Sequence, residues 1–160
     1  MKENKISYLL VRKMNFKKKN EEIMLHYKQI DCGHSGYIQD SQIIQAINRT
    51  KVEKKFLFLE IITGHNNGKD TLYRIIDLIE DLHSKTNKNF EYYFCPGNPD
   101  LTRHNPKIAK EHDWYKDLLP HNVKDNRGCI CVFFLNKTQL QDHYKELLNS
   151  NFYRTEILGF

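Results

Sequence analysis

The chain has 160 residues, of which 39% are hydrophobic, 12% aromatic and 28% charged. A chain of this size buries roughly two-thirds of its unfolded surface, and so many aromatic residues exclude a disordered protein. No apolar run approaches the ~20 residues of a membrane span, and the N-terminus lacks the apolar core of a secretory signal. We therefore expect one globular domain in the cytoplasm, with no membrane partner and with its four cysteines as free thiols.

The net charge of +5 is unevenly distributed. Residues 1–19 carry seven Lys or Arg and one Glu, whereas residues 20–160 carry eighteen basic and nineteen acidic residues. Basic segments neutralise phosphates, although a solvated chain terminus has the same composition. We interpret residues 1–19 as a basic N-terminal arm, with Lys17, Lys18 and Lys19 as candidate nucleic-acid contacts.

The first regular elements are predicted from caps and periodicity. Asn20 is a helix-capping residue and two glutamates follow it, so residues 20–29 are predicted to form a short helix. A strand then ends at Asp31. Isoleucines at i, i+1 and i+4 predict a second helix over residues 41–49, capped by Asp40 or Ser41.

The middle of the chain carries the strongest signals. Residues 56–62 (FLFLEII) are almost continuously apolar, which indicates a central strand buried on both faces, as in a parallel sheet. An amphipathic helix follows, because its apolar residues recur at helical spacing. They are Leu72, Ile75, Ile76, Ile79 and Leu82.

Two further strands are predicted over residues 90–95 and 128–135, with an insertion at about 96–127 between them. Thr138 and Gln141 resemble a capping box, which predicts a closing C-terminal helix. The order favours an α/β fold, namely a compact and mainly parallel β-α-β-α-β-β sheet covered by helices, with extra N- and C-terminal helices. We expect a single domain over residues 20–160.

Polar residues follow the two strands that we expect to be adjacent. The loops at 31–36 and 63–70 leave the carboxyl ends of these strands, and in an open parallel sheet such loops lie at one edge, where ligands bind. Helix N-termini at this edge favour anions such as phosphate. The candidate nucleic-acid-binding residues are Thr63, Gly64, Gly68 and Lys69.

His34 and His65 lie in these two loops, and Asp31 precedes the first. Imidazole titrates near neutrality, so two histidines at one phosphodiester can share the general base and general acid roles. We therefore select His34, Asp31 and His65 as candidate catalytic residues. The alternative is that the polar residues only satisfy turn and helix-end backbone groups. We expect no metal and no cofactor.

Several aromatic side chains also have two interpretations. Tyr92-Tyr93 and Trp114-Tyr115 either stack on nucleic-acid bases or pack in the core. Strand alternation places one of Tyr92 and Tyr93 in the core. Cys129 and Cys131 are expected on one face of the last strand, as core thiols.

Residues 30–36 (IDCGHSG) and 59–64 (LEIITG), with their following helices, resemble the small MutS-related (Smr) domain. In that family one strand ends in Asp-Leu-His-Gly and another in Thr-Gly-x-Gly. The resemblance implies a β-α-β-α-β-β unit that nicks or cleaves DNA or RNA. It matches Asp31 and His34 to the acid and the imidazole of the first motif, and Thr63 and Gly64 to the start of the second.

The sequence thus predicts a nucleic-acid-binding protein, either an endonuclease that cleaves RNA or nicks DNA without a metal, or a non-catalytic RNA- or ribosome-binding module. A third possibility is an interaction protein whose basic arm and insertion bind a protein partner. The choice between RNA and DNA and the oligomeric state stay open.

Overall fold

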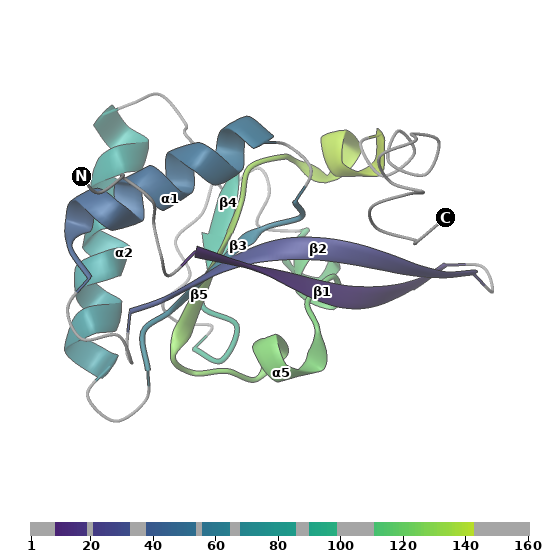
Figure 1. Ribbon diagram of the computed structural model, residues 1–160, viewed down its shortest axis with the longest axis horizontal. Coiled ribbons are helices and arrows are strands. Elements are labelled where there is room, and N and C mark those ends of the chain that lie inside the picture. Colours follow the sequence, from purple (N-terminus) through teal and green to yellow (C-terminus); the bar gives the residue numbers. More distant parts are fainter. Residues whose placement is uncertain are drawn as a thin grey trace, which may run out of the picture.

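We describe the fold from a computed structural model, in residues 9–18, 21–32, 38–53, 56–64, 68–85, 90–98 and 111–142. The order of its labelled helices and strands is β1 (Leu9–Lys18), β2 (Glu21–Asp31), α1 (Asp40–Glu53), β3 (Leu59–Ile62), α2 (Gly68–Lys85), β4 (Tyr92–Phe94), α4 (His112–Asp117), α5 (His121–Lys124) and β5 (Cys129–Phe133). From β2 onward, the labelled strands, α1 and α2 follow the predicted β-α-β-α-β-β order (Figure 1).

The five strands form one sheet in the order β1-β2-β3-β5-β4. Only β2 and β3 pair in parallel, whereas β1 with β2, β3 with β5, and β4 with β5 are antiparallel. The α/β class is confirmed and the mainly parallel sheet is wrong. The continuous apolar run at 56–62 indicated burial on both faces, which is equally typical of a covered antiparallel strand.

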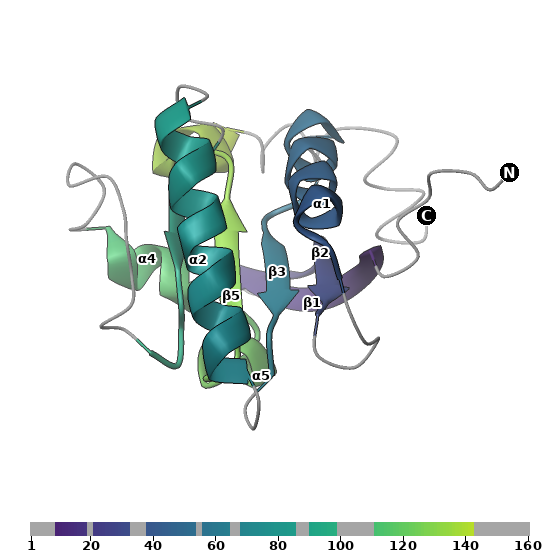
Figure 2. The same cartoon turned by 90° about the vertical axis from the view of Figure 1, so that its left-hand side faces the viewer.

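The sheet has a packed layer on each face (Figure 2). Alternate strand residues such as Leu59 and Ile61 pack with the apolar faces of α1 and α2. Phe58, Cys131 and Phe133 belong to the other layer, with Tyr115 of α4 and Val123 of α5. The segment predicted as an insertion therefore supplies one of the two core layers.

The helix predicted over residues 20–29 is wrong for residues 21–29, which belong to the strand β2. Its partner is β1, which the sequence placed in a basic arm. The two strands pair without a break from Leu9 opposite Ile30 to Lys18 opposite Glu21. Asn20 and the two glutamates gave a capping signal, but the backbone groups of β2 are satisfied by neighbouring strands instead.

Both predicted helix caps are shifted by one or two residues. The Gln39 N–H donates to Gln42 Oε1 at 2.8 Å, so Gln39 precedes α1 in a capping-box arrangement. Later in the chain, Asn136 and Gln139 exchange two such bonds, both of 2.9 Å. The helical residues 137–142 therefore begin after Asn136, and Leu140 is buried as predicted.

All four cysteines are buried free thiols, as predicted. Tyr92 and Tyr93 are both buried, since β4 is covered on both faces, and Tyr115 is buried as well. These three rings are core residues, so base stacking by them is wrong. No helix within the described ranges is long and apolar enough to cross a membrane.

Candidate nucleic-acid interface

The parallel pairing of β2 and β3 brings two predicted site segments together. Asp31, the last residue of β2, is opposite Ile62, the last residue of β3. The Cys32 N–H extends this pairing and donates to the Ile62 carbonyl at 2.8 Å. Asp31 therefore lies beside the Thr63-Gly64 segment, as the sequence predicted.

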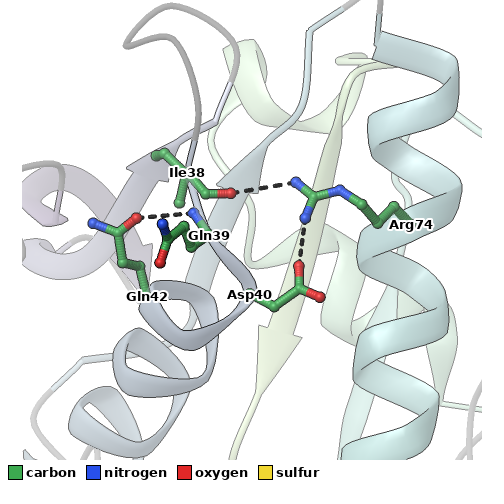
Figure 3. A network of polar contacts seen from close by, with 5 residues as sticks. All are labelled: Ile38, Gln39, Asp40, Gln42 and Arg74. Carbon is green, nitrogen blue, oxygen red and sulfur yellow. Dashed lines mark hydrogen bonds and ion pairs between the residues drawn. The ribbon is translucent and has the colours of Figure 1, made fainter.

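The first turn of α1 and the second turn of α2 are joined at the same end of the sheet. The side chain of Arg74, on α2, forms an ion pair with Asp40 in the first turn of α1. Its other terminal nitrogen donates to the Ile38 carbonyl at 3.4 Å (Figure 3). We call this end the loop edge and define it by Asp31, Thr63, Gly64 and Arg74.

The backbone of the Thr63-Gly64 segment is fixed by Gly128, the residue before β5. The Gly128 carbonyl accepts the Thr63 N–H at 2.6 Å and the Gly64 N–H at 3.1 Å. A Cβ on Gly128 would lie 2.5 Å from the Gly64 carbonyl oxygen, so only glycine fits this close approach. Gly64 itself has φ +89°, and a Cβ there would meet nothing within 4 Å.

Thr63 is 2% exposed, and its hydroxyl has no hydrogen-bond partner among the described residues. The space beside Gly64 is also open, because no atom of the described residues lies within 4 Å of the position that a Cβ would take there. Open space beside a glycine is a common feature of backbone that approaches a ligand closely. The loop edge thus combines an open backbone segment, a guanidinium and two helix N-terminal turns.

Cys32 is not a reactive nucleophile at this edge. Burial raises the pKa of its thiol to about 12, the nearby Arg74 lowers it, and Asp31 raises it. A thiol with this pKa stays protonated at neutral pH and is a weak nucleophile.

The carboxyl group of Glu60, in β3, is buried on the face of the sheet that is covered by α4 and α5. Glu60 is 2% exposed and accepts a bond of 2.8 Å from Gln29 Nε2, while Gln29 Oε1 accepts one of 3.0 Å from Arg12 Nε. Burial raises the pKa of Glu60, bonds from Gln29 and Cys129 and the charge of Arg12 lower it, and Asp31 raises it. Glu60 is the only acidic residue in the apolar run at 56–62, which was a detectable signal.

The structure does not test the other predicted site residues. His34 and His65, with Lys19, lie outside the described residues. Gly68 is the first residue of α2 and Lys69 the second. Whether the two histidines share a cleft therefore stays a prediction.

Lys17 and Lys18 are separated from the loop edge by the length of a strand. They pair with Glu22 and Glu21 at the start of β2, whereas Asp31 ends that strand. Eleven residues of strand span roughly 35 Å at about 3.3 Å each. These two residues, predicted as nucleic-acid contacts of the basic arm, are thus at the other end of β2 from the loop edge, and each is opposite an acidic residue.

Arg74 and Gly128 were missed at the sequence level. Arg74 lies among the apolar residues that defined the amphipathic helix, and only the packing of α2 against α1 brings it to the loop edge. Gly128 directly precedes the last strand. A glycine at this place often marks the close approach of another backbone segment, so the sequence did contain a signal for this contact.

Comparisons with models of known protein families, with curated proteins and with solved structures find no match to this chain. The resemblance to the Smr domain therefore rests on the motif residues alone. Within the described ranges, no three His, Cys, Asp or Glu side chains are grouped so that they could hold a metal ion.

Proposed function

We propose that the protein binds nucleic acid at the loop edge and cleaves it there as an endonuclease. The observation that carries this proposal is the parallel pairing of β2 and β3, with Asp31 opposite Ile62. It sets the backbone at Thr63-Gly64 and two helix N-terminal turns at one end of the sheet, where α/β proteins bind phosphate-bearing ligands. The resemblance to the Smr motifs at the same residues supports the same function.

Arg74 is the cation that we assign to phosphate recognition. A guanidinium has donors for two phosphate oxygens and stays charged at all relevant pH values. In this structure it pairs with Asp40, whose side chain is 52% exposed. An exposed ion pair stabilises by less than about 1 kcal/mol, so a phosphate can compete with Asp40 for Arg74.

The proposed reaction on RNA needs only acid and base groups. One base removes the proton of the 2′-hydroxyl, whose oxygen attacks phosphorus, and the bond to the 5′ oxygen breaks as an acid protonates that oxygen. We assign proton transfer to His34 and His65 and the orientation of His34 to Asp31. Arg74 offsets the charge that develops on the phosphate.

Binding is tested with a charge series at the loop edge. Arg74→Ala should weaken binding of single-stranded RNA and flatten the log–log salt dependence by about 0.7 for the lost phosphate contact. Asp40→Asn should strengthen binding, because Arg74 loses its competitor. Asp117→Asn, in the partly exposed Asp117–Lys124 pair, changes the net charge equally on the other layer and should have no effect.

Cleavage is tested separately with labelled single-stranded RNA, duplex RNA and supercoiled DNA, each with and without a chelator. His34→Ala should lower the rate by about 10²–10⁴-fold and change binding little, because it removes a proton transfer. Full activity of this variant would refute the catalytic assignment. Binding without cleavage of any substrate would favour the non-catalytic RNA- or ribosome-binding module.

A further inference from the structure

The outer side of β1 is an unpaired sheet edge in the described part of the chain. β1 lies at one end of the strand order and pairs only with β2, through ten consecutive residue pairs. The opposite edge is β4, which has three residues, all buried. β1 is thus the long edge of the sheet (Figure 1). Val11 on this strand is 53% exposed.

Two hydrogen bonds between β2 and the β3 segment show which backbone groups of β1 face outward. Lys28 N–H donates to Phe58 and Cys32 N–H to Ile62, so even-numbered residues of β2 direct their backbone groups toward β3. Odd-numbered residues of β2 therefore face β1, because successive residues of a strand alternate in direction. Tyr27 is one of them and is opposite Arg12.

The even-numbered residues of β1 consequently bond to β2, and the odd-numbered residues face away from the sheet. The outward N–H and C=O groups belong to Leu9, Val11, Lys13, Asn15 and Lys17. A regular row of such groups without proline is a template for an added strand.

The charge of β1 indicates which kind of added strand would pair with it. β1 contains four basic residues and no acidic one, and its existing partner places Glu22 and Glu21 opposite Lys17 and Lys18. An antiparallel second copy of β1 would add four more cations to the same edge. Opposite charges across neighbouring strands stabilise pairing and like charges destabilise it.

We propose that the outer edge of β1 binds an extended acidic segment of a partner protein as an added strand. Backbone hydrogen bonds to residues 11, 13, 15 and 17 give the affinity, and acidic residues opposite Lys13 and Lys17 give the preference. This interaction is independent of the proposed nucleic-acid function, because β1 borders β2 on the side away from β3.

The first test uses ten-residue peptides and the full chain, measured by fluorescence anisotropy. A peptide of alternating Thr and Glu should bind. The same peptide with Gln in place of Glu should bind with an affinity that is lower by at least about tenfold. Two further peptides carry backbone N-methyl groups, one at all odd positions and the other at all even positions. One of them should not bind and the other should bind normally, because only alternate residues of the added strand donate their N–H to β1. Equal binding by both methylated peptides would show attraction by charge alone and overturn the proposal.

The second test changes the protein. Asn15→Pro removes an outward N–H, so it should abolish peptide binding and leave the unfolding midpoint nearly unchanged. A large drop in the midpoint without peptide would mean that this N–H is already paired within the chain, which also overturns the proposal.

A charge reversal provides a variant that does not depend on proline. Lys13→Glu with Lys17→Glu should abolish binding of the Thr-Glu peptide and create binding of a Thr-Lys peptide. The matched control is Arg49→Glu with Lys51→Glu, on the exposed side of α1, which should leave peptide binding unchanged. Unaltered preference in the β1 double variant would contradict an acidic partner at this edge.

Discussion

The two ends of β2 have different surroundings. Residues 28–30 lie between β1 and β3 and lead to the loop edge, whereas residues 21–27 pair, among the described strands, with β1 alone. Tyr27 marks the boundary, because it is buried and its ring stacks on Phe58 at 4.6 Å. Core packing therefore fixes the backbone at the loop edge, whereas residues 21–26 of β2 pair, among the described strands, with β1 alone.

The strongest perturbation of this contrast is Phe58→Ala. Phe58 is fully buried and its ring also lies 5.3 Å from that of Phe133, so the substitution should lower the free energy of unfolding by about 3–5 kcal/mol. Val11→Ala, on the exposed part of β1, should change it by less than about 0.5 kcal/mol. Urea denaturation measures both, and similar losses in the two variants would remove the distinction.

Gly128→Ala should have the second-largest effect, about 1–3 kcal/mol, because its Cβ collides with the Gly64 carbonyl. Gly64→Ala should cost roughly 1–2 kcal/mol, since its φ of +89° is strained for alanine but the space is open. Gly128→Ala should also weaken RNA binding, because the loop-edge backbone shifts. A Gly64 variant that is less stable than the Gly128 variant would contradict the assigned roles.

These contacts show why part of the fold was predictable. The spacing of Leu72, Ile75, Ile76 and Ile79 predicted α2, and these side chains are buried. Strand direction was not predictable, because a strand covered on both faces is apolar throughout whichever way its neighbours run.

β2 illustrates a competing signal. Its residues Ile23, Leu25 and Tyr27 alternate with period two, as in a strand, but the polar residues at 20–22 match a helix N-terminus. The pairing with β1 decides between them, and pairing between segments is absent from local propensity.

The candidate site was predictable only as far as adjacent strands determine it. Asp31 and Thr63 lie together because Asp31 ends β2 and Thr63 directly follows β3, its parallel neighbour, as the sequence predicted. Arg74 and Gly128 join them through tertiary contacts of α2 and β5, which no local pattern encodes. Lys17 and Lys18, predicted as nucleic-acid contacts of a basic arm, belong to β1 at the end of β2 that is far from the loop edge, and their contact with nucleic acid stays a prediction.

Glu60→Gln should make the protein more stable at pH 7 by about 1 kcal/mol. Because burial raises the pKa of Glu60 above 4.5, the folded state holds its proton more tightly than the unfolded state does. Wild-type stability is therefore complete below this unfolded value and falls as the pH rises through the folded pKa. The difference between the two proteins should grow from pH 4 to pH 8, and a constant difference would contradict a raised pKa.

Arg74→Ala should have the smallest effect on stability, less than about 1 kcal/mol, because its ion pair with Asp40 is partly exposed. The same substitution should lower the free energy of RNA binding by a larger fraction than it lowers the free energy of unfolding. Thermal unfolding and anisotropy on the same samples measure both. A loss of stability comparable to that of Phe58→Ala would assign Arg74 to the core instead of the ligand.

The most direct test of the loop edge is amide hydrogen exchange of the protein with and without single-stranded RNA. Bound RNA should slow exchange in peptides that contain Cys32, Gly64 and the first turn of α2, and leave peptides from β1 unchanged. Protection confined to β1, or no protection at Cys32 and Gly64 under saturating RNA, would contradict nucleic-acid binding at the loop edge.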